Sequence, residues 1–229
     1  GLHFHVGSQL FDNDSHLQAT DIILGLVDKI REEFGYEMKE LNVGGGFGVT
    51  YVDEERMPYA YFTDAMMEKI EKYYAEKGVT RPNVVIEPGR SIAAEAGLTL
   101  YTIGSIKDIP GIRKYVSVDG GMTDNIRPAL YQAVYTGVIA NKADQEKTEK
   151  VTICGKCCES GDILITDLDI ATPESGDTFA IFSTGAYGYT MASNYNKNTI
   201  PGVVFVKDGV DRVVVKPQTY DDMLANEIL

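Results

Sequence analysis

The sequence predicts an α/β region followed by a mainly antiparallel β region, with the change near Arg90. Before that residue, short apolar strands alternate with amphipathic helices, a pattern typical of a parallel sheet or barrel. After it, short β-branched segments are separated by Gly, Pro and Asp, which indicates antiparallel strands. The chain of 229 residues is 44% hydrophobic, enough for a sizeable core. We therefore predict two domains, residues 1–90 and 91–229.

The first half is predicted to alternate strand and helix. Leu2 to Val6 alternates apolar residues with His3 and His5, as in a strand. A helix is then expected to begin at a capping box of Ser15 and Gln18 and to end at Gly35 in the left-handed conformation. The apolar face of that helix is formed by Ile23, Val27, Ile30 and Phe34.

Two further strands and one helix complete this half. Leu41 to Val43 is a short strand before a glycine loop, and Val84 to Glu87 is the next. Between them, a helix from about Tyr61 to Gly78 places four apolar residues on one side: Phe62, Met66, Ile70 and Tyr73.

Short strands dominate the second half. A hairpin is expected around Lys207-Asp208-Gly209, joining residues 202–206 and 210–215. Residues 141–150 lack apolar periodicity and are predicted to be a surface loop. The other expected strands are Leu98 to Ile106, Tyr115 to Val118, Val151 to Cys154 and Thr178 to Phe182.

Composition limits the possible partners. A net charge of -13 and a pI near 4.6 disfavour nucleic acid, because phosphates would be repelled. No apolar run approaches the roughly 18 residues that span a bilayer. Three closely spaced cysteines, Cys154, Cys157 and Cys158, suit a reducing compartment. We expect a cytoplasmic protein with neither a nucleic-acid nor a membrane partner.

Two strand ends carry residues suited to an anion and a ring nitrogen. The loop Gly44-Gly45-Gly46-Phe47-Gly48 allows backbone amides to approach a phosphate, or it is a tight structural turn. It fits neither a dinucleotide fingerprint nor a P-loop. Glu87-Pro88-Gly89-Arg90 places an acid at one strand tip and a cation in the first turn beyond it, unless the two form a surface ion pair.

His5 and Ser8 lie at another strand end. His3 and His5 share a face, but no third ligand has the spacing that zinc requires, so we predict no metal site. A better hypothesis is an imidazole against an aromatic ring with a hydroxyl on a phosphate. For His3 alone, a core histidine is the simpler interpretation.

Three motifs in the second half suggest further chemistry. Cys158-Glu159-Ser160-Gly161-Asp162 sets a thiol beside two acids, where it could donate a proton, whereas Cys154 and Cys157 lack the context of a zinc or redox site. Arg127 and Tyr131 are spaced to grip a carboxylate, or they cap a loop. Tyr187, in a glycine-flanked segment, offers a phenol to phosphate or belongs to a plain turn.

Taken in chain order, six segments resemble the diaminopimelate decarboxylase family of pyridoxal phosphate enzymes. They read HFHVGSQ, GGGFG, EPGR, DGGMTDNIRPALY, CESGD and GAYGYTMASNYN. The resemblance extends over the whole chain. It implies the last part of a (β/α)8 barrel followed by a C-terminal β domain. It also implies conversion of meso-diaminopimelate to L-lysine and CO2.

The resemblance assigns roles to single residues. His5 would stack on the ring of pyridoxal 5'-phosphate and Glu87 would face its nitrogen. Cys158 would reprotonate the α-carbon from a neighbouring subunit of a homodimer. The phosphate would be held by Ser8, Gly44, Gly45, Gly46, Gly89, Arg90 and Tyr187. The amino-acid substrate would be held by Arg90, Arg127, Tyr131, Glu159 and Tyr187.

The family's Schiff-base lysine has no counterpart in the sequence. It lies upstream of the first motif, and no lysine here follows a strand in the matching context. The chain opens inside a predicted strand and holds about three of the eight βα units of a barrel. We therefore expect a C-terminal portion that is inactive alone, with a separate N-terminal fragment as a possible partner.

Two alternatives remain open. Arginine, ornithine and carboxynorspermidine decarboxylases share the fold, but they would need a different grip on the distal end of the substrate. A non-catalytic homologue that binds and modulates a decarboxylase is the second alternative. The missing lysine favours it, whereas Cys158 argues against it.

Overall fold

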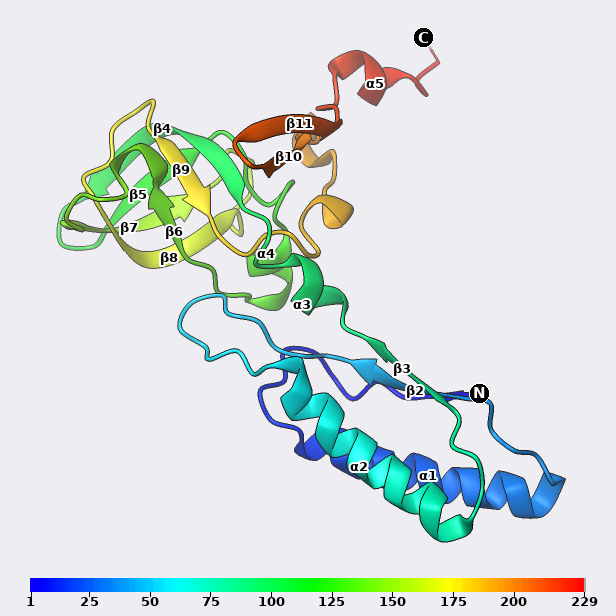
Figure 1. Cartoon of the computed structure of the whole chain (residues 1–229). Helices are drawn as coiled ribbons and strands as arrows, with labels where there is room; N and C mark the ends of the chain where they lie inside the picture. Colours follow the sequence, from blue (N-terminus) through cyan, green and yellow to red (C-terminus); the bar gives the residue numbers. More distant parts are fainter. Residues whose placement is uncertain (229) are drawn as a thin grey trace. The chain divides into compact units, whose positions relative to one another are not determined.

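A computed structural model describes residues 1–228, which form two compact units (Figure 1). The first is Gly1–Ala94 and the second begins at Glu95. The division lies shortly after Arg90 because the short helix α3 (Gly89–Ala93) is part of the first unit. Among the described residues, no helix is both long and apolar enough to cross a membrane.

The first unit is a parallel sheet with two helices packed on one face (Figure 1). Its strand order is β1 (Leu2–His3), β2 (Glu40–Gly45), β3 (Asn83–Glu87), and both pairings are parallel. The helices are α1 (Asp14–Phe34) and α2 (Tyr59–Lys77). This is the strand–helix alternation that the apolar pattern predicted.

One apolar core joins this sheet to its helices. Leu41 and Val43 of β2 face the helices, because alternate strand residues point to the same face. Their partners on the helices include Ile23, Val27, Phe62, Met66 and Ile70. One expectation was wrong: Phe34 at the end of α1 is 70% exposed. Tyr73 packs against the core as expected but is only partly buried, whereas its neighbour Tyr74 is fully part of the core.

The start of α1 differs from the prediction, whereas its end agrees. The N-cap residue is Asn13 and makes no side-chain capping bond, so Ser15 lies inside the helix and the predicted capping box is wrong. Instead, the Asp12 carboxylate accepts from the amide of Asp14 at 3.1 Å. Gly35 and Gly78 both end their helices with left-handed φ angles of 62° and 66°, where a side chain would be strained.

The second unit contains a six-stranded sheet in the order β6-β9-β4-β5-β7-β8. All neighbours are antiparallel except β5 and β7. The long strand β4 pairs with β9 along its first part and with β5 along its second. The strands are β4 (Thr99–Ile109), β5 (Arg113–Val118), β6 (Gly137–Ile139), β7 (Glu149–Cys154), β8 (Ile163–Ile170) and β9 (Thr178–Ile181).

The prediction missed β6 and β8 and simplified residues 141–150. A 3-10 turn, η1 (Ala140–Lys142), overlaps the start of that segment, and β7 begins inside it. Asn141 and Lys142 bind the buried Asp177, with Asn141 Nδ2 and Lys142 Nζ each 2.8 Å from a carboxylate oxygen. The start of this segment is therefore anchored and is not a plain surface loop.

Smaller elements complete the second unit. The predicted hairpin is confirmed as β10 (Val203–Lys207) and β11 (Val210–Val215), and Asp208 and Gly209 take positive φ angles of 52° and 77°, as a tight hairpin turn requires. The remaining elements are α4 (Arg127–Tyr131), η2 (Tyr189–Met191), η3 (Tyr195–Lys197) and α5 (Tyr220–Leu224).

Candidate functional site

Three polar side chains meet on the face of the parallel sheet opposite the helices. His3 pairs with Asn42 in the ladder between β1 and β2, and Asn42 pairs with Val85 in the ladder between β2 and β3. His3 Nε2 lies 3.3 Å from Glu87 Oε2, and Asn42 Nδ2 donates to Glu87 Oε1 at 2.7 Å. Each strand thus contributes one group, and the Glu87 carboxylate stays half exposed.

A cationic group lies just beyond β3. Arg90 Nη2 donates to Ser8 Oγ at 3.0 Å, and Arg90 Nη1 donates to Tyr51 Oη at 2.6 Å. The guanidinium also lies over the Tyr51 ring, 5.8 Å from its centroid. Arg90 and Ser8, which are 82 positions apart, are therefore brought together as the hypothesis of a phosphate grip requires. Tyr51 was missed, because nothing in its local pattern distinguishes it from a core aromatic residue.

Glycine is required in this loop because other backbone atoms pack closely against it. A Cβ atom on Gly44 would lie 2.4 Å from Phe4 O, and one on Gly46 would lie 2.2 Å from Gly7 O. Both residues also have positive φ angles, 72° and 90°. The Gly44 amide donates to Asn42 Oδ1 at 2.9 Å, so it is directed at the protein. These contacts explain the glycines by the needs of a tight turn. They also place the loop against the segment that contains Phe4 and Gly7.

His5 and Gly89, the other predicted site residues of this unit, are both exposed. His5 follows β1, and Gly89 begins α3. Asn42 was not predicted. A polar residue in the otherwise apolar Leu41-Asn42-Val43 strand, directly before the glycines, was the signal that could have identified it.

In the second unit, Arg127 lies between two tyrosine rings. Its guanidinium carbon is 5.3 Å from the ring centroid of Tyr131 and 5.5 Å from that of Tyr187. Arg127 Nε is buried and has no hydrogen-bond partner among residues 1–228. Tyr187 has a φ of 61°, an uncommon conformation for a bulky residue. These three predicted residues therefore share one site, with two half-exposed phenols beside a cation.

The Cys158–Glu159 turn is held by the segment that contains η3. The Cys158 amide donates to Asn196 Oδ1 at 2.8 Å, and Tyr195 Oη donates to Glu159 Oε2 at 3.4 Å. The Gly161 amide and the Ser160 hydroxyl lower the pKa of Glu159, so its carboxylate is favoured. The Cys158 thiol is exposed. The turn thus presents a thiol and an anion to its surroundings.

Asp162, at the end of the same motif, is the buried anchor of this region. Its carboxylate accepts from the amides of Met122 at 2.7 Å and Cys157 at 2.8 Å. Burial, and then the charge of Asp162, raise the pKa of the Cys157 and Cys154 thiols. Those two thiols are therefore less easily ionised, which agrees with the absence of a redox context in the sequence.

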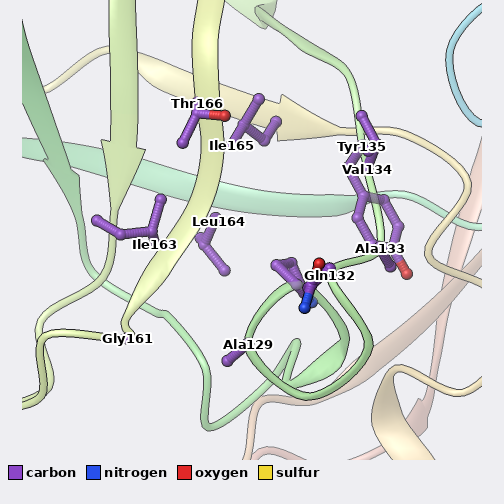
Figure 2. A pocket seen from close by; sticks show the side chains of 11 residues that line it. Ala129, Gln132, Ala133, Val134, Tyr135, Gly161, Ile163, Leu164, Ile165 and Thr166 are labelled. Carbon is purple, nitrogen blue, oxygen red and sulfur yellow. The ribbon is translucent and has the colours of Figure 1, made fainter.

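A separate cavity of about 310 Å³ lies between the α4 region and β8 (Figure 2). Ala129, Gln132 and Val134 approach it from one side, and Leu164 and Ile165 from the other (Figure 2). None of the residues predicted for a site lines this cavity. It is mainly apolar and lacks an ionisable group other than Tyr135.

The family comparisons agree with the motifs. Residues 1–94 match the model of the pyridoxal-dependent decarboxylase, pyridoxal binding domain. Diaminopimelate decarboxylase of Bacillus subtilis is 47% identical over 225 residues, covering 98% of this chain and 51% of that protein. The chain is similar to the diaminopimelate decarboxylases over nearly its whole length. That of Staphylococcus aureus is 44% identical over 229 residues, 99% of this chain and 53% of that protein.

Solved structures of diaminopimelate decarboxylases share the fold. One from M. jannaschii has a TM-score of 0.91 at 37% identity, and the match covers all of this chain and 52% of the M. jannaschii chain. One from Helicobacter pylori, complexed with L-lysine, has a TM-score of 0.87 at 29% identity. That match covers 97% of this chain and 53% of the Helicobacter pylori chain. The chain thus spans about half the length of the diaminopimelate decarboxylases that it matches.

Proposed function

We propose that this chain forms part of a diaminopimelate decarboxylase that converts meso-diaminopimelate to L-lysine and CO2. The observation that carries the proposal is that Glu87 lies at the end of β3 and that Arg90, just beyond it, donates to Ser8 from the segment after β1. Relatives with bound L-lysine, from M. jannaschii and Helicobacter pylori, support this substrate class. The first unit would then be the last βα units of a (β/α)8 barrel, and the second the C-terminal domain.

The residues present fit pyridoxal 5'-phosphate. Arg90 and Ser8 offer a cation and a hydroxyl within one hydrogen-bonded group, which suits a phosphate. Glu87 offers a carboxylate that would hold a proton at the ring nitrogen, and Asn42 and His3 orient that carboxylate. The exposed imidazole of His5 would stack on the ring. When bound, the cofactor would supply an electron sink for decarboxylation.

The second unit would supply the substrate and proton-transfer groups. Arg127 with Tyr131 and Tyr187 would bind a substrate carboxylate, since an arginine fork matches it bidentately. Cys158 would deliver a proton to the α-carbon of the substrate, and Glu159 would bind its amino group. These two residues would act on the site of a second subunit in a homodimer. The Asn196 and Asp162 contacts hold the turn that carries them.

The lysine that binds the cofactor covalently would come from outside these residues. Several lysine amines are already paired with carboxylates within their own unit. They belong to Lys69, Lys77, Lys114, Lys142, Lys150 and Lys197. We infer that the chain alone is inactive and is completed by a further polypeptide segment, in the cytoplasm.

Complementation tests the proposal. The chain is mixed with the N-terminal half of the Bacillus subtilis relative, and CO2 release is measured with meso-diaminopimelate, arginine and ornithine as substrates. Activity on meso-diaminopimelate alone is expected, with a loss of at least about 10²-fold in Glu87→Gln, because a hydrogen-bonded charge is removed. Glu76→Gln, on the surface of α2, is the matched control.

Activity confined to arginine or ornithine would refute the proposed substrate. No activity with a well-formed complex would favour a non-catalytic homologue.

A further inference from the structure

His16 is a fully buried histidine that none of the steps above uses. It lies on α1 with 0% of its surface exposed. Its ring stacks on Phe47, with centroids 5.6 Å apart, and meets the edge of Phe62 at 5.5 Å. Its Nε2 lies 2.8 Å from the carbonyl oxygen of Gly45. An imidazole in the apolar core thus makes a hydrogen bond to the middle of the glycine loop.

The role of Nε2 follows from this bond. A carbonyl oxygen only accepts, so Nε2 carries the hydrogen and is the donor. Nδ1 is buried and has no partner among residues 1–228. Burying a polar ring with one unsatisfied nitrogen costs free energy that an apolar ring would not cost. The compensating contact is the single bond to Gly45.

Gly45 is the point at which the glycine loop touches the strand of Glu87. The two residues pair in the parallel ladder, beside a shift in its register. A Cβ atom on Gly45 would lie 1.9 Å from the carbonyl oxygen of Glu87. The backbones are therefore so close that a rotation of the Gly45 peptide would displace the end of β3. His16 fixes the orientation of that peptide from the helix side of the sheet.

We infer that His16 is a positioning residue: its hydrogen bond to Gly45 holds the glycine loop and Glu87 in register for the cofactor. This rests on the proposed function, because the affected ligand is pyridoxal 5'-phosphate. His16 does not touch the open face that carries Glu87, so it acts through the Gly45 backbone. The contacts from α1 to Gly45 and from Gly45 to β3 would thereby link the helical layer to Glu87, the acid that would face the ring nitrogen.

Three variants of the full chain separate this role from ordinary core packing. His16→Phe keeps an aromatic ring but removes the donor, whereas His16→Gln keeps an amide donor at a similar reach. Thr20→Val is the matched control, because Thr20 is also fully buried on α1 and its hydroxyl donates to the His16 carbonyl at 2.7 Å. Affinity for pyridoxal 5'-phosphate is measured by absorbance titration well below each melting temperature. Amide exchange in residues 44–47 is measured by mass spectrometry.

We expect His16→Phe to weaken cofactor affinity about tenfold, from the loss of one buried hydrogen bond, and to speed exchange in residues 44–47 by a similar factor relative to α2. His16→Gln should restore both properties to within about threefold, and Thr20→Val should change neither. If His16→Phe binds the cofactor and exchanges like the wild type, the inference is wrong. If the wild type binds no cofactor, the proposed cofactor site fails, and the exchange rates alone decide whether His16 positions the loop.

Discussion

Replacing Gly45 with alanine tests whether the junction between the glycine loop and β3 is as tight as the structure indicates. The added methyl carbon would lie 1.9 Å from the Glu87 carbonyl oxygen and 2.7 Å from its carbon. The φ of Gly45 is not in the left-handed region, so a side chain is not excluded by backbone conformation. The perturbation is therefore a steric one between β2 and β3.

The expected cost follows from the required movement. Real Cβ atoms essentially never approach other atoms closer than 3.0 Å, so the strands must separate by about 1 Å. Overpacking of this kind costs about 2–3 kcal/mol in a well-packed region. With a urea dependence of about 1.5–2 kcal/mol/M, the unfolding midpoint should fall by about 1–2 M.

Urea unfolding followed by the helical band of circular dichroism is the suitable assay. The two long helices, of 21 and 19 residues, are both in the first unit, whereas the α-helices described in the second have five residues each. The helical signal therefore reports mainly the unit that contains Gly45. It does not require tryptophan, which the sequence lacks.

Two other glycines provide matched controls. Gly25, inside α1, has nothing within 4 Å of a built Cβ, and its replacement by alanine should stabilise the unit by about 1 kcal/mol. Gly78 also has open space but a φ of 66°, so Gly78→Ala should cost about 1–2 kcal/mol through conformation alone. The reasoning is refuted if Gly45→Ala unfolds at the same urea concentration as the wild type while Gly78→Ala is destabilised.

Three further predictions concern charge and thiols. The Tyr73 hydroxyl and then Lys77 lower the pKa of Asp28, so the charged Asp28 stabilises the first unit above its ordinary pKa of 3.8. That stabilisation is lost as the pH falls through the lowered pKa. Asp28→Asn should therefore flatten the dependence of stability on pH in this acid range, and an unchanged pH profile would contradict the argument. Asp162→Ala leaves two backbone amides unpaired and should lower the free energy of unfolding, measured by thermal unfolding, by about 2–4 kcal/mol. The control Asp169→Ala, at an exposed position, should lower it by less than about 0.5 kcal/mol. Equal losses of stability in the two variants would contradict the anchoring role of Asp162. Because burial raises the pKa of Cys154 and Cys157, Cys158 should react first with a disulfide reagent near pH 8, so Cys158→Ser, and not Cys157→Ser, should abolish the fast phase.

Local pattern predicted most of the first unit. The recurrence of Ile23 and Val27, and of Phe62, Met66 and Ile70, at helical spacing reflects burial of one helix face, which depends little on the rest of the fold. The boundaries were less certain. Asn13 and Ser15 both suit an N-cap, and only the path of the chain before α1 selects between them.

Site residues at motifs were also accessible from sequence, whereas their supporting partners were not. Glu87, Arg90 and Ser8 belong to recognisable segments, but neither the contact of Tyr51 with Arg90 nor the anchoring contacts of Asp162 could be predicted from the sequence. Their roles come from contacts between residues that local spacing does not relate.

The sequence by itself determined the succession of elements in the first unit and the chemical types at the strand ends. These follow from local periodicity, glycine conformation and the resemblance of six motifs. Only the tertiary structure decided that His3, Asn42 and Glu87 meet on one face, that Arg127 lies between two phenols, and that His16 supports Gly45. The physical reason is that strand register and helix packing set distances between residues far apart in the chain, and a hydrogen bond depends on those distances to within a few tenths of an ångström.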